Sequence, residues 1–189
     1  MADILILYAS KHGQTQKIAT RIARALEADG VTTRLHDAAS RAERTPHDHD
    51  AVIVGASIHA GHHQREIVEW AKAHRTTLNT MPSAFFSACL TAADDTDESR
   101  EATRRYIDEF LDATGWIPRK TSTFAGALQY REYDFATRLL MRLLMRKGGH
   151  PTDAGQDYDY TDWDAVDHFA HECAGMVAAE PVGRGSQDQ

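Results

Sequence analysis

Apolar runs alternate along the chain with segments of helical periodicity. The first run, residues 4–8, is too short for a helix, and its continuous apolar character is typical of a strand buried on both faces. In the next segment, 17–28, apolar residues recur at helical spacing. The alternation continues to the end of the chain. Further strands are predicted at 31–36, 51–55, 84–90 and 121–128, and further helices at 64–76, 99–114 and 161–177.

Repeated alternation of strand and helix predicts the fold class. Right-handed helical crossovers between parallel strands give a sheet that is covered by helices on both faces. The class is therefore α/β, a three-layer sandwich, and five strands suggest the flavodoxin-like order 2-1-3-4-5, with ligands at the carboxyl ends of strands 1, 3 and 4. In the helix 99–114 we expect Ser99 as N-cap and Gly115 as the C-terminal stop. We expect one domain over 1–178 and a disordered tail over 179–189.

The turn between the first strand and the first helix carries candidate chemistry. Its residues are Ser10, Lys11, His12, Gly13, Gln14 and Thr15. Backbone N–H groups and the positive end of the helix dipole would point at an anion there, with hydroxyl groups as further donors. The turn can equally be an ordinary helix N-cap, since Ser and Thr are favoured caps. It lacks the glycine motifs that bind nucleoside triphosphates and dinucleotides, and it resembles the loop with which flavodoxin-like proteins hold flavin mononucleotide (FMN).

A long segment, about 129–159, interrupts the alternation where a connection of two to six residues would be usual. Inside it, residues 133–147 predict an amphipathic helix of about 20 Å, too short to span a bilayer. Arg138, Arg142 and Arg146 repeat along one face, and residues 129–150 have a net charge of +3. A basic amphipathic helix on an acidic protein suggests attachment to an anionic membrane surface. Alternatively, the helix packs on its own domain or on the partner of a homodimer.

Composition narrows the class of protein. With 189 residues, 42% of them hydrophobic and 26% charged, the chain can bury a substantial core. A net charge of −7 argues against nucleic-acid binding. The two cysteines lie in different elements, the chain begins directly with a strand rather than a signal peptide, and no apolar run reaches about 18 residues. We therefore expect a cytoplasmic protein, peripherally associated with the membrane.

Two further classes of site are disfavoured by the sequence. The histidines His59, His62 and His63 follow the third strand, but neither zinc spacing nor a supporting carboxylate is evident, so no metal is expected. A phosphorelay receiver shares the strand order but needs an aspartate on the third strand, where this chain has Gly55.

Five short motifs in order narrow the flavodoxin interpretation. They are Gly13-Gln14-Thr15, Gly55-Ala56-Ser57-Ile58 with Gly61-His62, Asn79-Thr80-Met81-Pro82-Ser83-Ala84-Phe85, Gly126-Ala127-Leu128 with Tyr130, and Tyr160-Thr161-Asp162-Trp163. Together with the long segment after the fifth strand, they resemble the flavodoxin-type, menaquinone-dependent protoporphyrinogen IX dehydrogenases of bacterial haem synthesis. The resemblance covers about residues 3–177.

The resemblance implies an FMN enzyme that oxidises protoporphyrinogen IX to protoporphyrin IX in three two-electron steps and passes the electrons to a membrane quinone, menaquinone or ubiquinone. No catalytic side chain is expected, because the flavin carries the chemistry. The FMN phosphate would be held by Ser10, Lys11, His12, Gly13, Gln14 and Thr15. A second flavin loop would consist of Ser57, Ile58, His59, Ala60 and Gly61. The isoalloxazine ring would be flanked by Ser87, Ala88, Cys89, Leu90 and Thr91.

The same resemblance assigns the segment after the fifth strand to substrate binding. The flavin would be covered by Gly126, Ala127, Leu128, Gln129 and Tyr130. Propionates of the porphyrinogen, or the membrane, would be contacted by Arg138, Arg142 and Arg146. Cys89 is expected to be a packing residue rather than a redox thiol. Two alternatives remain open, an NAD(P)H-dependent FMN quinone reductase and a flavodoxin that carries electrons and has no substrate of its own.

Overall fold

The computed structural model describes residues 1–40, 44–94, 96–128 and 157–178. Their centre is a parallel sheet with the strand order β2-β1-β3-β5-β6. The short strand β4 adds to β3 in antiparallel direction. The bounds of the parallel strands are Asp3–Ala9 for β1, Thr32–Asp37 for β2, Ala51–His59 for β3, Ser83–Cys89 for β5 and Lys120–Ala125 for β6. The short hairpin strand β4 lies outside this order, so the five parallel strands correspond to the five predicted strands. The predicted α/β class and strand order are therefore confirmed.

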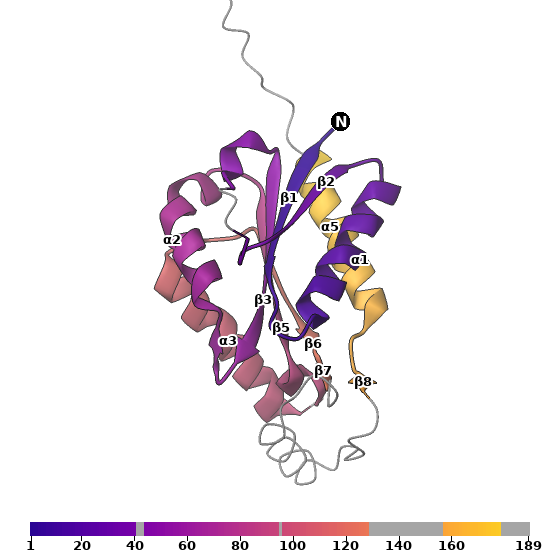
Figure 1. The fold of residues 1–189 in the computed structure, drawn as a ribbon, viewed down its shortest axis with the longest axis vertical. Coiled ribbons are helices and arrows are strands. Elements are labelled where there is room, and N and C mark those ends of the chain that lie inside the picture. Colours follow the sequence, from indigo (N-terminus) through magenta and orange to yellow (C-terminus); the bar gives the residue numbers. More distant parts are fainter. Residues whose placement is uncertain (41–43, 95, 129–156, 179–189) are drawn as a thin grey trace, which may run out of the picture.

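Helices cover both faces of the sheet (Figure 1). The helices α1 (Gln14–Ala28) and α5 (Trp163–Ala178) lie on one face, and α2 (Arg65–Leu78) and α3 (Asp97–Thr114) lie on the other. Each pair of helices closes its own hydrophobic core, one built with α1 and α5 and one with α2 and α3. The expected three layers are therefore present in the described residues.

Strand β1 shows why the sheet is buried on both faces. Side chains alternate along a strand, so Ile4 and Ile6 enter the core under α1 and α5, while Leu5 and Leu7 enter the core under α2. All four are at most 1% exposed. A strand between two helical layers has no polar face, which explains the continuous apolar run in the sequence.

Gly55 on β3 is required by the packing of an aromatic side chain. A Cβ atom at this position would lie 2.0 Å from Cζ of Phe86 on the neighbouring strand β5. The ring of Phe86 in turn contacts the rings of Phe124 on β6 and Phe169 on α5. The glycine therefore allows an aromatic cluster to form between the sheet and the last helix.

Several predicted bounds are wrong for identifiable reasons. The cap of α3 is Thr96, whose side chain accepts a hydrogen bond from the Ser99 backbone N–H; Ser99 itself is already inside the helix. Strand β3 continues past residue 55 because its end pairs with β4 (His62–His63) in a hairpin, where cross-strand hydrogen bonds replace apolar burial. Helix α1 begins at Gln14 rather than at residue 17, because polar side chains occupy its first turn.

The predicted strand 121–128 is divided in the structure. Strand β6 ends at Ala125, and after Gly126 the chain forms β7 (Ala127–Leu128), which pairs in antiparallel direction with β8 (Tyr158–Asp159). The two short strands flank the segment 129–156 in the sequence, so this segment leaves and rejoins the described fold at adjacent positions. The predicted helix 133–147 and the expected tail 179–189 lie outside the described residues. Within the described ranges, no helix has the length and apolar character needed to cross a membrane.

Candidate functional site

The turn from β1 to α1, which begins the first crossover, leads into a helix whose amino end has no side-chain cap. Gly13 occupies the N-cap position with a φ of 84°, in the left-handed region that favours glycine. No side chain forms a capping hydrogen bond there, and the first turn of the helix contains no acidic residue. The alternative interpretation of this turn as an ordinary Ser or Thr cap is therefore wrong. Backbone N–H groups at the positive end of α1 remain available to an anion.

Two hydroxyl groups of the same turn lack partners. The side-chain oxygens of Ser10 and Thr15 are buried and form no hydrogen bond with the described residues. Burying a hydroxyl without a partner costs free energy, and such groups are uncommon in folded proteins. A phosphate that accepted hydrogen bonds from these hydroxyls and from the start of α1 would satisfy them. The turn thus has the donor set of a phosphate site.

Gln14 has a second role that the sequence did not indicate. Its Nε2 donates hydrogen bonds to Oδ1 of Asp159 at 2.9 Å and to Oγ1 of Thr161 at 2.8 Å. The Thr161 hydroxyl donates in turn to the backbone oxygen of Ala125 at 2.9 Å. The side chain of Gln14 therefore ties the first crossover to the end of β6 and to the segment that leads into α5. We call these contacts the Gln14 clamp.

The second predicted loop, Ser57 to Gly61, folds as the β3–β4 hairpin. Its turn uses positive φ angles, 50° at Ala60 and 84° at Gly61. Ser57 is fixed by Gln64, whose Oε1 accepts from the Ser57 N–H at 3.0 Å and whose Nε2 donates to the Ser57 hydroxyl. The Ser57 side chain is thus already engaged within the protein, in contrast to Ser10 and Thr15.

The two predicted loops meet at their tips. Nζ of Lys11 and Nε2 of His59 are 2.6 Å apart, and the ring of His12 lies edge-on to that of His59 with centroids 6.4 Å apart. A cleft of about 340 Å³ lies between the loops. It is lined by Ala9, Ser10, Lys11, Asp37, Ala39, His59, His62, His63, Gln64 and Glu66. The carboxyl ends of β1 and β3 therefore form one concave site, as the strand order predicts.

The carboxyl end of β5 joins this site through His63. Nε2 of His63 lies 2.9 Å from the hydroxyl of Ser87, one of the predicted ring-flanking residues. The imidazole packs edge-on against Phe85 and Phe110, at centroid distances of 5.3 and 5.2 Å. Burial, with a smaller contribution from His62, lowers the pKa of His63 to about 4. The ring is therefore neutral at pH 7.

The predicted groups after β5 and β6 contact each other. The N–H of Gly126 donates to the backbone oxygen of Cys89 at 3.1 Å, and a Cβ on Gly126 would lie 3.5 Å from backbone atoms of Cys89 and Leu90. Burial raises the pKa of the Cys89 thiol, which disfavours the reactive thiolate. This environment agrees with a packing role for Cys89. Of the other predicted residues, Gln129, Tyr130, Arg138, Arg142 and Arg146 lie outside the described residues.

The clustered histidines do not form a metal centre in the described part of the chain, where no group of three or more His, Cys, Asp or Glu side chains could hold a metal ion. His59 and His62 instead line the cleft, and His63 is engaged with Ser87.

Comparison with known proteins identifies the family. The family model described as "Flavodoxin domain" matches residues 5–155. The chain belongs to the flavodoxin-domain family. The expected cofactor, FMN, is confirmed by this membership, and the unpaired hydroxyls and amides of the first crossover fit its phosphate.

Two curated relatives are similar over nearly the whole chain. The protoporphyrinogen IX dehydrogenase [quinone] of Escherichia coli (strain K12) is 36% identical over 173 residues, which cover 92% of this chain and 95% of that protein. The protein of the same name from Leishmania major is 37% identical over 179 residues, covering 94% of this chain and 77% of that protein.

Solved structures of flavodoxins share the fold at much lower identity. Oxidised flavodoxin 1 from Bacillus cereus superposes with a TM-score of 0.56 at 16% identity, covering 92% of this chain and 98% of that one. The flavodoxin of Streptococcus pneumoniae TIGR4 gives a TM-score of 0.54 at 16% identity, with coverage of 94% and 99%. These likenesses confirm the flavodoxin-like fold of the chain.

The unpaired hydroxyl of Thr15 gives the first prediction. We expect the substitution Thr15→Val to weaken FMN binding by about tenfold or more, because a net hydrogen bond to a charged acceptor contributes on the order of 1.5–3 kcal/mol. The FMN-free variant should be at least as stable as the wild type, since a buried hydroxyl without a partner is removed. Fluorescence titration with FMN and thermal unfolding of the FMN-free protein measure the two effects.

The matched control for this prediction is Thr103→Val on α3. The Thr103 hydroxyl donates to the Arg100 backbone oxygen at 3.0 Å, so its loss should leave FMN affinity unchanged and should not stabilise the protein. Unchanged FMN affinity in Thr15→Val would contradict the assignment of this hydroxyl to the phosphate.

His63 gives a prediction about pH. Its folded pKa of about 4 lies below the ordinary value of 6.5, so between these values the unfolded chain binds more protons. The free energy of unfolding should therefore fall as the pH drops through this window, by up to about 3 kcal/mol. Urea denaturation at pH values from 7 to 4.5 measures the loss. The loss of stability should be smaller in His63→Gln. It should persist in Ser87→Ala, because burial is the main cause of the lowered His63 pKa. Equal losses in the wild type and in His63→Gln would show that His63 is not the origin of the pH dependence.

Proposed function

We propose that this protein is an FMN-dependent dehydrogenase that oxidises protoporphyrinogen IX to protoporphyrin IX and transfers the electrons to a quinone. The observation that carries the proposal is the similarity of 36–37% over more than nine-tenths of the chain to two proteins of that name from distant organisms. The similarity to electron-carrying flavodoxins is much weaker, at 16% identity. Among the alternatives, the dehydrogenase therefore has the strongest support.

The geometry supports a specific placement of the cofactor. The amino end of α1 and the hydroxyls of Ser10 and Thr15 would bind the FMN phosphate, because these donors are otherwise unpaired among the described residues. The hairpin 57–61 and the chain after β5 would flank the isoalloxazine ring, since both lie at the carboxyl edge of the sheet beside the phosphate turn. In this placement Gln14 acts through its clamp rather than as a direct ligand.

The bound flavin would supply the acceptor for the hydride that leaves the porphyrinogen. The residues of the chain position the reactants. Gln64 fixes the second loop through Ser57, and the contact between Lys11 and His59 joins that loop to the phosphate turn. His63, neutral at pH 7, adds no positive charge beside Ser87. The roles of these residues are binding and orientation, which agrees with a reaction whose chemistry belongs to the cofactor.

Anaerobic mixing tests the proposed function directly. When the FMN-loaded protein is mixed with protoporphyrinogen IX, the visible flavin band should bleach rapidly, and reoxidation by added quinone should restore it. NADH should not bleach the flavin. Stopped-flow absorbance measures both reactions. Bleaching by NADH alone would instead identify an NAD(P)H-dependent quinone reductase, and bleaching by neither reductant would favour an electron carrier.

We further propose that the segment 129–156 attaches the protein to an anionic membrane surface. The support is its sequence alone, in which Arg138, Arg142 and Arg146 repeat along one side of an apolar helical pattern. The base of the segment is formed by β7 and β8, next to the Gln14 clamp and therefore next to the proposed phosphate site. Such a position would bring lipid-dissolved quinone to the flavin.

Replacing Arg138, Arg142 and Arg146 together with glutamine should weaken binding to vesicles that contain phosphatidylglycerol by about tenfold or more, since each basic residue near an anionic surface contributes about 1 kcal/mol. Vesicle co-sedimentation at low salt measures the change. The matched control, Arg65→Gln with Arg75→Gln and Arg105→Gln on α2 and α3, removes the same charge elsewhere. If both triple variants bind the vesicles as the wild type does, the segment is not the membrane anchor.

A further inference from the structure

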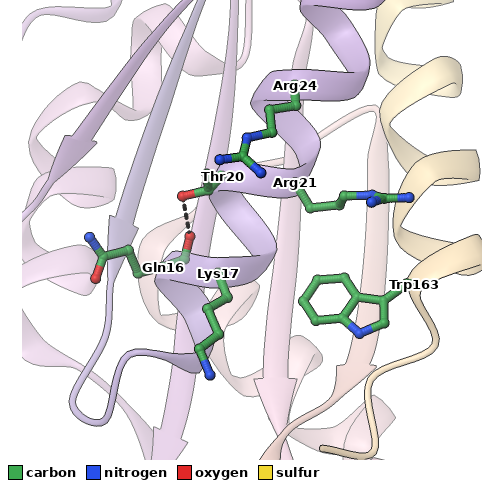
Figure 2. A pocket seen from close by; sticks show the side chains of 6 residues that line it. All are labelled: Gln16, Lys17, Thr20, Arg21, Arg24 and Trp163. Carbon is green, nitrogen blue, oxygen red and sulfur yellow. Dashed lines mark hydrogen bonds between the residues drawn. The ribbon is translucent and has the colours of Figure 1, made fainter.

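A groove of about 490 Å³ lies on the outer side of α1, where this helix meets the first residue of α5. Figure 2 shows its lining side chains, which are Gln16, Lys17, Thr20, Arg21, Arg24 and Trp163. Lys17, Arg21 and Arg24 follow one another at helical spacing, so three cations lie along one face of α1. The groove is separate from the cleft between the two predicted flavin loops, with which it shares no lining residue.

The three cations are not equally available. Nε and Nη2 of Arg21 donate to the two carboxylate oxygens of Asp167 on α5 at 2.7 and 2.6 Å. The negative charge of Asp164 also stabilises the Arg21 guanidinium, and both carboxylates raise its pKa. In contrast, the side chains of Lys17 and Arg24 form neither an ion pair nor a hydrogen bond with any described residue. Among the described residues, two positive charges without an ion pair therefore line this groove, in a chain whose net charge is −7.

Trp163 gives the groove an apolar wall. Its indole is partly buried and packs against the core under α1 and α5. In Figure 2 the ring lies beside α1, close to the side chains of Lys17 and Arg21. The indole N–H donates to no described residue, so the wall also offers a hydrogen-bond donor. An indole ring with an apolar face and an N–H that is unpaired among the described residues is suited to a ligand with both apolar and polar parts.

The spacing of Lys17 and Arg24 along α1 favours a particular shape of ligand. Lys17 and Arg24 are seven residues apart, which places them about 10 Å apart along the helix axis. Trp163 follows Thr161, which the Gln14 clamp fixes to the start of α1. The chain that leads into Trp163 is therefore fixed beside α1, and a ligand with two separated acidic groups could contact both cations.

We propose that this groove binds an amphipathic dianion, with one acidic group at Lys17, the other at Arg24, and its apolar body on Trp163. Tetrapyrroles with two propionates, including protoporphyrinogen IX and protoporphyrin IX, belong to this class; this identification rests on the proposed function. Lys17 is the fourth residue of α1, one turn from the phosphate site. The groove is then a holding site for substrate or product beside the cofactor site, and no dehydrogenation takes place in it.

Protoporphyrin IX is a suitable probe, because it is stable in air and quenches tryptophan fluorescence. Titration into the FMN-loaded full-length protein should quench the emission, and Trp163→Phe should lose most of the quenching although Trp70 and Trp116 remain. The double variant Lys17→Gln with Arg24→Gln should bind at least about tenfold more weakly, because two charge-assisted contacts are lost. Protoporphyrin IX dimethyl ester, which has no acidic groups, should bind the wild type as weakly as the acid binds this variant.

The matched control is Lys72→Gln with Arg105→Gln, which removes one lysine and one arginine from α2 and α3 and should retain wild-type affinity. Equal binding of the acid and the ester, quenching that persists in Trp163→Phe, or absence of porphyrin binding would overturn the proposal. Binding of phosphatidylglycerol vesicles that depends on Lys17 and Arg24, without porphyrin binding, would also overturn it and identify a lipid contact.

Failure of this proposal can be distinguished from failure of the proposed function. Flavin bleaching by saturating protoporphyrinogen IX should be preserved in the Lys17→Gln, Arg24→Gln variant, since neither residue lines the cleft between the flavin loops. Wild-type protein that binds protoporphyrin IX at this groove but shows no bleaching would refute the dehydrogenase and retain the groove. Bleaching without binding at the groove would have the opposite meaning.

Discussion

Unsatisfied hydrogen-bond donors at the first crossover are the constraint on which the site depends. Helix α1 begins at a left-handed glycine with no capping side chain, and the hydroxyls of Ser10 and Thr15 are buried beside it without partners among the described residues. Each of these features lowers the stability of the ligand-free protein. The same features become favourable contacts when an anion accepts the hydrogen bonds, so ligand binding and folding are linked at this turn.

The Gln14 clamp extends this constraint across the molecule. Its partners, Asp159 and Thr161, follow the segment 129–156 and precede α5, while the Thr161 hydroxyl reaches back to the end of β6. One side chain of the phosphate turn thus fixes the position from which the long segment rejoins the fold. Pairing of β7 with β8 brings the other end of that segment to the same place. The turn proposed to bind the FMN phosphate and the segment proposed to meet the membrane are therefore anchored together.

The sequence predicted those parts of the fold that depend on local patterns. Strands β1, β3 and β5 are mostly apolar because both of their faces are buried. Their continuous apolar runs could therefore be recognised as strands in the sequence. The strand order predicted that the carboxyl ends of β1, β3 and β5 lie at one edge of the sheet. Ser10, His59 and Ser87 do lie at this edge. The clamp was not predictable, because Gln14 and Asp159 are 145 residues apart and neither residue type is diagnostic. Thr96 was missed as the cap of α3 because Ser99, also a favoured cap, lies three residues later and only backbone geometry distinguishes them.

The two proposed anion sites differ in the physical origin of their affinity. The donors at the phosphate turn are backbone amides and neutral hydroxyls, and the nearby Lys11 is already engaged with His59. Binding there depends on the orientation of dipoles in a partly buried turn, which salt screens less than charges at the surface. The groove at Lys17 and Arg24 depends on full charges at the surface, which salt screens strongly. In a chain with a net charge of −7, binding at the proposed cofactor site would therefore depend less on ionic strength than binding at the charged groove. A difference of this kind would allow the ligand of the groove to exchange while the cofactor stays bound.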